Sequence, residues 1–401
     1  MYNRILIVER QKLANGNFEI ELSFNDNQVY TLVVNNPFSA KKEQQLEQYF
    51  EEYLRFPFTD EVTYQQIATS IIEYGEFLFQ QIFQTRPEIS QTYQQISQSG
   101  QIKVEIIGKS LEFNAIHWES LKNPQNRQPF AITHPVIRKP FLKSKSFEPL
   151  VISKTLNVLL VVARHKGQVD ASYRTISLPL VQMIWDDNEN KKKIAVNIDI
   201  VRPATYCALV QQLEAKGKGF YHLIHFDTHG SLLEYDELDE GIYRTEDCGR
   251  EEIASYEGQK AFLLLVSDKY QNYADVIEAR ELANLLQKYQ IPIVVLNACQ
   301  SAKQSATEMS LAHHLAKAGG QVVIAMAYSV TVSAAKKFMQ ALYVNLLQTG
   351  QFNQAILKAR HALYQNKTRS AYFNVNIDLE DLLLRKGFRI TGWVIAKGWR
   401  F

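Results

Sequence analysis

The sequence has few cysteines, no long apolar run and almost no net charge, and each shortage excludes a class of protein. Its three cysteines, Cys207, Cys248 and Cys299, are not an even set and have no metal-ligand spacing, so they predict neither a disulfide framework nor a zinc site. No apolar run approaches the roughly 20 residues of a membrane-spanning helix, and Met1–Arg10 lacks the features of a secretion signal. We therefore expect a cytoplasmic protein with no membrane partner, in which any special cysteine is reactive rather than structural.

Charge of one sign is also scarce. The chain has 44 Lys and Arg residues against 42 Asp and Glu, a net charge of +2, which does not predict direct binding of nucleic acid. Apolar residues make up 46% of the sequence, so a large core can be buried and global disorder is excluded. A length of 401 residues fits two domains.

The pattern of the chain changes near residue 150, where we place a domain boundary. In residues 1–150, Phe18–Phe24 and Val29–Val34 flank an Asn-Asp-Asn turn and predict paired strands, while Thr63–Phe83 carries the apolar stripe of a helix. Five prolines in 123–150 predict a connecting segment. We expect the first 150 residues to form an α+β region that packs on the second domain.

Residues 151–401 alternate short apolar runs with helical stretches. Most of the runs are nearly continuous in apolar residues, as in parallel strands that are buried on both faces. Such alternation predicts an α/β fold, a doubly wound and mainly parallel sheet flanked by helices, with its site at the carboxyl ends of the strands. The predicted strands are Leu156–Val162, Ile194–Ile198, Tyr221–Phe226, Ile291–Leu296 and Val322–Met326, and the predicted helices are Thr205–Ala215, Arg280–Tyr289, Thr307–Ala318 and Ser333–Leu347.

Two motifs stand at the carboxyl ends of neighbouring predicted strands. The first is His225-Phe-Asp-Thr-His-Gly230, and the second is Leu296-Asn-Ala-Cys-Gln-Ser301. A cysteine nucleophile needs a base that generates the thiolate, and hydrogen-bond donors that bind the oxyanion formed from the substrate. His229 and Cys299 supply the base and the nucleophile, and the backbone N–H groups of Gly230 and Cys299 supply the donors.

These motifs, together with Leu159–Arg164, Tyr173–Ile176 and Val323–Val330, resemble the CHAT family of caspase-like cysteine peptidases. The resemblance implies a caspase-like fold, with residues 1–150 as an accessory or pseudo-caspase part and 151–401 as the peptidase domain. It implies peptide-bond hydrolysis by a Cys299–His229 dyad through an acyl-enzyme, with no cofactor and no metal. It further implies a protein substrate, a separate sensor or activator protein, and a role in a regulated defence or cell-death-like pathway.

The resemblance also implies which residues bind the substrate. Asn297, two residues before the nucleophile, is expected to line the pocket for the side chain that precedes the scissile bond, with Arg164 nearby. Ala327, Tyr328 and Ser329 are expected to pair with the extended substrate. Because an amide cannot offset the desolvation of a substrate Lys or Arg as a carboxylate does, we expect an uncharged side chain in this pocket.

Some residues of these motifs have alternative interpretations. His225 and Asp227 are predicted to support His229 by orienting the neighbouring backbone, but the three also share one strand face and form a hypothetical site for a catalytic metal. A further alternative is an interaction module that keeps the fold and signals without catalysis. The stretch Glu234–Glu257 holds ten acidic and two basic residues, which indicates either a solvated loop or a lid over the site.

Overall fold

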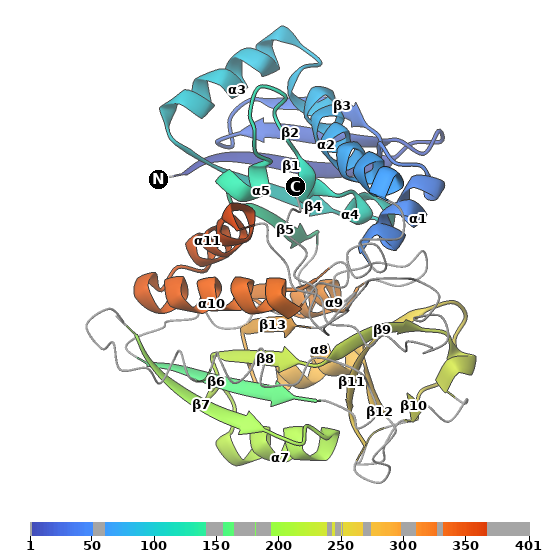
Figure 1. The fold of residues 1–401 in the computed structure, drawn as a ribbon, viewed down its shortest axis with the longest axis vertical. Coiled ribbons are helices and arrows are strands. Elements are labelled where there is room, and N and C mark those ends of the chain that lie inside the picture. The colour runs from blue at the N-terminus through green and yellow to red at the C-terminus, as the bar shows by residue number, and fades with distance from the viewer. Residues whose placement is uncertain are drawn as a thin grey trace, which may run out of the picture.

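Three β-sheets organise the molecule, two of five strands and one of four within the part of the chain described here. The computed structural model describes residues 2–50, 61–141, 155–163, 181, 194–238, 243–244, 250, 252–267, 274–297, 310–326 and 332–366. The N-terminal third of the chain forms one layered part of the molecule, and the other two sheets belong to the second part (Figure 1).

The N-terminal sheet has the strand order β3-β2-β1-β4-β5, with β1 antiparallel to β2 and parallel to β4. The predicted pair of strands is confirmed as β2 and β3, and the predicted long helix is confirmed as α2. The elements of this part are β1 Tyr2–Lys12, β2 Phe18–Phe24, β3 Val29–Val34, α1 Ala40–Gln48, α2 Glu61–Phe83, α3 Pro87–Ser99, β4 Gln101–Gly108, α4 Leu111–Ala115, α5 Phe130–Thr133 and β5 Val136–Pro140.

β5 corrects one prediction made from the sequence. The proline-rich segment 123–150 was expected to be a connection only, yet Val136–Pro140 pairs in parallel with β4 and extends the sheet. Proline lacks a backbone N–H and is tolerated on an edge strand, and β5 is the edge strand on this side of the sheet.

The central sheet carries the five strands predicted after residue 150, with small shifts at their ends. Its strand order is β14-β13-β8-β6-β7, and all neighbouring strands are parallel. The parallel order agrees with the nearly continuous apolar runs, because both faces of the sheet are covered. The strands are β6 Thr155–Val162, β7 Ala195–Val201, β8 Leu223–Asp227, β13 Ile293–Asn297 and β14 Val322–Ile324.

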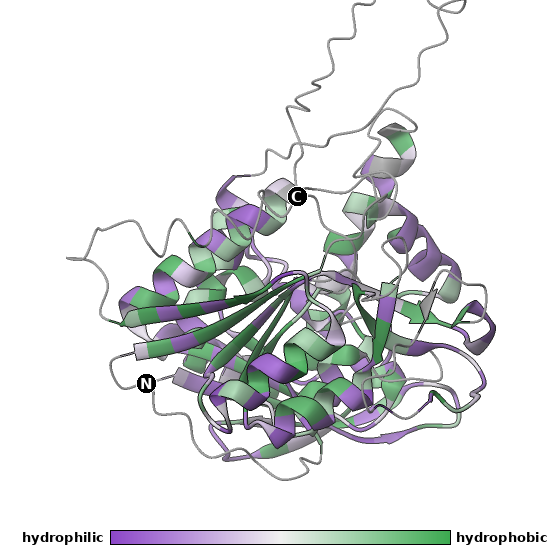
Figure 2. Ribbon diagram, turned by 90° about the horizontal axis from the view of Figure 1, so that it is seen from below, coloured by the Kyte–Doolittle hydropathy of each residue, from purple (hydrophilic) through white to green (hydrophobic). Residues whose placement is uncertain are grey.

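Helices cover both faces of the central sheet, so the predicted doubly wound architecture is confirmed. Alternate residues of β8 divide between the two faces: Ile224 and Phe226 pack in the core with α7, α8 and α9, whereas Leu223 packs in the core with α10 and α11. In Figure 2 the strands are hydrophobic along most of their length, as this burial requires. The helices are α7 Tyr206–Lys216, α8 Ala279–Lys288, α9 Leu311–Lys317, α10 Val332–Thr349 and α11 Phe352–Gln365.

A third sheet, with the order β10-β12-β11-β9, begins where the central sheet ends. After β8 ends at Asp227, a single residue, Thr228, leads into β9, which pairs antiparallel with β11. The chain therefore changes sheet inside the first motif. The strands are β9 His229–Leu233, β10 Tyr243–Arg244, β11 Lys260–Val266 and β12 Ala274–Glu278.

The two parts of the molecule contact each other through helices. α11 packs against α5, and α9 packs against β5 (Figure 1). Near this contact, Arg138 of β5 forms an ion pair with Glu119. Burial alone would raise the pKa of Glu119, but the positive charges of Arg138 and of Arg360 in α11 outweigh this effect and lower the pKa to about 2. Among the helices described, none combines the length and the apolar character needed to cross a membrane.

Candidate active site

The carboxyl ends of three adjacent parallel strands meet around Asp227. In the central sheet β8 lies between β13 and β6, and Asp227 is in register with Asn297 of β13 and with Val162 of β6. The backbone N–H of Ala163, directly after β6, donates to the carbonyl oxygen of Asp227 at 3.1 Å. Ligand sites of open α/β sheets lie at this edge, so Asp227 of the first motif and Asn297 of the second lie where a site is expected.

Asp227 and Asn297 also join through their side chains. The amide Nδ2 of Asn297 donates a hydrogen bond to Oδ1 of Asp227 at 3.0 Å. Asp227 is fully buried and Asn297 is 6% exposed. The two side chains that precede the predicted base and the predicted nucleophile by two residues are thus in direct contact.

His229 opens the third sheet immediately beyond this contact. It is half-buried, and it is in register with Leu264 of β11, while Gly230 is in register with Leu263. Thr228, which separates His229 from β8, donates its backbone N–H to the carbonyl oxygen of Asn297 at 3.4 Å and its hydroxyl to the carbonyl oxygen of Leu264. The backbone before His229 is therefore bonded to both β13 and β11.

His225 precedes Asp227 by two residues on β8, and its side chain is buried in the core. Its Nδ1 is 2.9 Å from the hydroxyl of Tyr343 in α10, and the two rings are stacked with centroids 5.9 Å apart. Both side chains are fully buried, and this burial lowers the pKa of His225 to about 4, although the nearby Asp227 opposes the shift. His225 is thus a neutral imidazole that joins β8 to α10.

Several of the predicted site residues lie outside the described residues. Cys299 follows the end of β13 by two residues, Arg164 follows Ala163 directly, and Ala327, Tyr328 and Ser329 follow Met326, two residues beyond β14. Each of them stands in the sequence just after the carboxyl end of a strand of the central sheet. Of the predicted residues that the structure describes, it brings Asp227 and Asn297 together, and it puts His229 and Gly230 on the strand that follows.

Three structural features of this region were not predicted from the sequence. Tyr343 was assigned only to a helix, Thr228 was treated as part of the motif without a role, and the contact between Asp227 and Asn297 was not foreseen. The sequence holds a signal for this contact, since Asp227 precedes His229 and Asn297 precedes Cys299 by the same two positions.

The structure also bears on two expectations from the sequence, the hypothetical metal site and the absence of a disulfide framework. Among the described residues, no three His, Cys, Asp or Glu side chains are grouped so as to hold a metal ion. Cys207, in the first turn of α7, is disulfide-bonded, which differs from the expectation that the cysteines stay reduced.

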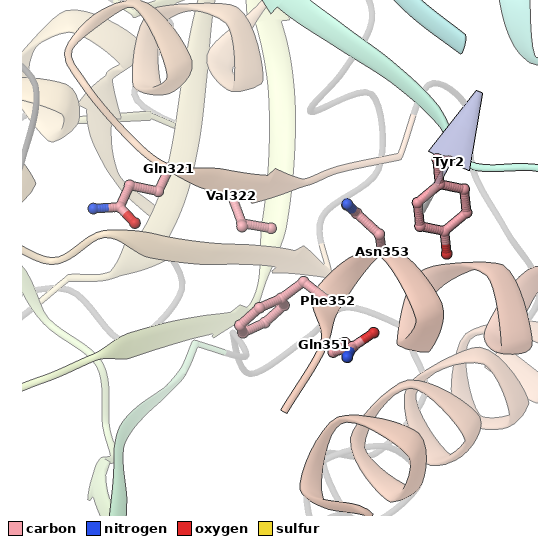
Figure 3. A pocket seen from close by; sticks show the side chains of 6 residues that line it. All are labelled: Tyr2, Gln321, Val322, Gln351, Phe352 and Asn353. Atoms are coloured by element: carbon pink, nitrogen blue, oxygen red, sulfur yellow. The ribbon is translucent and has the colours of Figure 1, made fainter. Parts of the chain in front are cut away.

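A cavity of about 450 Å³ lies away from these strand ends. Gln321 and Val322 line it at the amino end of β14, together with Phe352 at the start of α11 and Tyr2 of β1 (Figure 3). The hydroxyl of Tyr2 accepts a hydrogen bond from Gln354 at 3.1 Å. Because parallel strands have their carboxyl ends at the opposite edge, this cavity is separate from the candidate active site.

The family model of the CHAT domain matches residues 73–377, which is most of the chain and includes both motifs. No curated protein matches the sequence.

Proposed function

Because this chain belongs to the CHAT domain family of caspase-like cysteine peptidases, we propose that it is a cysteine endopeptidase in which Cys299 is the nucleophile and His229 the base. The observation that carries the proposal is the register between β8 and β13, which sets Asp227 opposite Asn297. His229 and Cys299 each follow this pair by two residues.

Simple chain geometry supports contact between the two catalytic side chains. Neighbouring strands lie about 4.8 Å apart, and two residues extend a chain by at most about 7 Å. Each of these two side chains is thus only two residues from the paired strand ends, and we propose that they meet there.

The proposed reaction proceeds in two steps. His229 takes the proton of the Cys299 thiol, the thiolate sulfur attacks the substrate carbonyl carbon, and the oxyanion is bound by the N–H groups of Gly230 and Cys299. His229 then gives the proton to the leaving amine as the peptide bond breaks. Water, deprotonated by His229, attacks the thioester, and the acid product and the free thiol are released.

The proposal extends to the surroundings of the dyad. Arg164, Asn297 and residues 327–329 are proposed substrate contacts, and Asp227 and His225 are proposed supports of the site. The substrate is proposed to be a protein, with no cofactor and with a separate sensor or activator protein, in a regulated defence or cell-death-like pathway in the cytoplasm.

Peptide-library profiling tests the proposed activity. The wild-type protein, Cys299→Ala and His229→Ala are each incubated with a library of proteome-derived peptides, and new termini are identified by mass spectrometry. We expect cleavage by the wild type and none by these two variants, with Asn197→Asp on β7, away from the carboxyl ends of the strands, as an active control. Cleavage that persists unchanged in Cys299→Ala or in His229→Ala contradicts the proposed dyad.

A further inference from the structure

We infer that Asp227 and Asn297 form a strand-end clamp that positions the Cys299–His229 dyad, so that both act as positioning residues for the proposed reaction. The inference rests on the proposed function for its consequences and on the described contacts for its geometry.

The clamp joins the two strands at their last residues. Asp227 and Asn297 are in register across β8 and β13, and their side chains are hydrogen-bonded at 3.0 Å. The ordinary ladder of a parallel sheet ends here, since His229 already belongs to another sheet. Among the residues described, this side-chain bond and the bond from the Thr228 N–H to the Asn297 carbonyl oxygen are the last connections in the central sheet between the chain of the base and the chain of the nucleophile.

Burial makes this bond costly to lose. Asp227 is fully buried and Asn297 only 6% exposed, so a separated pair has little access to water to replace the bond. A polar pair that must stay together is suited to fixing the distance between two chain segments.

Thr228 links the clamp to His229 and restrains the position of His229. Thr228 donates its N–H to the carbonyl oxygen of Asn297 at 3.4 Å, and its hydroxyl bonds to the carbonyl oxygen of Leu264. His229 therefore follows a residue that is bonded to the nucleophile strand on one side and to β11 on the other. A displacement of about 1 Å between catalytic groups can reduce the rate by about a hundredfold, so this restraint has a measurable effect.

The clamp also assigns a positioning role to the side chain of Asn297. An amide has two N–H donors and one oxygen acceptor, and one donor of Asn297 is used by Asp227. A specificity residue presents its polar atoms to the substrate, whereas a clamp residue needs them for its partner. The two roles predict different outcomes when the amide and the carboxyl group are exchanged.

The exchange is the test. Asp227→Asn leaves two amides, Asn297→Asp brings two carboxyl groups together, and the double variant Asp227→Asn/Asn297→Asp restores one amide and one carboxyl group in reversed order. The readout is the rate of alkylation of Cys299 by iodoacetamide, measured on the peptide that contains Cys299. In this reaction the thiolate sulfur displaces iodide from the methylene carbon and the thiol proton passes to His229, so the rate reports the dyad without a known substrate.

We expect alkylation to slow about tenfold in Asp227→Asn and about a hundredfold in Asn297→Asp, where like charges meet. The double variant is expected to return to within about threefold of the wild type. On any peptide substrate, kcat is expected to fall in Asp227→Asn with little change in KM. Asn197→Asp is a matched control, because Asn197 and Asn157 are also a hydrogen-bonded pair in register, on β7 and β6, away from the carboxyl ends. It is expected to alkylate at the wild-type rate.

Wild-type rates in both single variants overturn the clamp, as does a double variant with restored thermal stability but without restored alkylation. If the double variant does not fold, Asp227→Ala, Asn297→Ala and their combination replace it. The clamp then requires that the combination be no slower than the slower single variant, and additive losses contradict it. The proposed function fails separately, if Cys299→Ala retains cleavage.

Discussion

The imidazole of His225 and the phenol of Tyr343 lie in the core with their ring planes nearly parallel, 118 positions apart in the chain, with Nδ1 and the hydroxyl oxygen 2.9 Å apart. The contact joins β8 to α10 directly beneath the candidate active site. Because both side chains are fully buried, a charge on His225 would be expensive, and the pKa of His225 falls to about 4. The pair therefore makes the stability of the fold depend on pH.

His225 is expected to make the fold acid-sensitive. Its folded pKa of about 4 lies below its ordinary value of 6.5, so as the pH falls below 6.5 the unfolded chain binds a proton that the folded chain does not. Stability is therefore lost between pH 6.5 and pH 4, by about 2–3 kcal/mol from this residue. Urea unfolding at pH 7 and pH 4 should show that His225→Gln loses less stability than the wild type by this amount. Equal losses in the two proteins would refute the assignment.

Thr228 is expected to stabilise the crossing from the central sheet to the third sheet. Thr228→Val keeps the size of the side chain but removes the hydroxyl that bonds to Leu264, leaving a buried carbonyl with one partner fewer. A loss of about 1–2 kcal/mol in the free energy of unfolding is expected, with slower alkylation of Cys299. Thr228→Ser retains the hydroxyl and serves as the control, and an equal loss in both variants would indicate a packing effect instead.

Arg250 is expected to anchor the acidic stretch 234–257. Its guanidinium pairs with Asp275 at 2.8 Å and Glu281 at 2.6 Å, and it lies 4.2 Å above the ring of Tyr206. The side chain is 2% exposed, so Arg250→Met leaves a carboxyl group buried without this partner and should cost about 3–5 kcal/mol.

Limited proteolysis measures the same anchor locally. Cleavage within 234–257 should be faster in Arg250→Met than in the wild type, whereas Lys216→Met, which removes a partly exposed ion pair with Asp199 outside this stretch, should cleave at the wild-type rate. First cuts confined to 123–150 in all three proteins would contradict the role of Arg250.

Cys207 is expected to be bonded to Cys248, which leaves Cys299 free. Cys248 precedes Arg250 by two residues, and Arg250 stacks on Tyr206, the neighbour of Cys207. Peptide mapping without reductant should recover Cys207 linked to Cys248, with Cys299 as a thiol. A linkage of Cys207 to Cys299 would remove the proposed nucleophile from reaction and contradict the account.

The sequence predicts the parts of this fold whose signals are local. Most strands of the central sheet are nearly continuous apolar runs, and the motifs at His229 and Cys299 mark two strand ends. β5 was missed because an edge strand next to prolines buries little, and the third sheet was missed because the change of sheet at Thr228 has no periodic signal. The bond between Asp227 and Asn297 depends on strand register, which side-chain alternation alone does not fix between distant strands.

The most direct test of the central claim is a map of covalent labelling by a peptidyl acyloxymethyl ketone, a reagent whose ketone mimics the scissile carbonyl and which alkylates a catalytic thiolate. A set of such reagents that vary in the residue next to the ketone is incubated with the wild type, with His229→Ala and with wild type in EDTA, and the labelled peptides are identified by mass spectrometry. The account predicts a single adduct, on Cys299, formed at least about a hundredfold more slowly in His229→Ala and unaffected by EDTA. An adduct on Cys207 or Cys248, or equal labelling of Cys299 with and without His229, would contradict it.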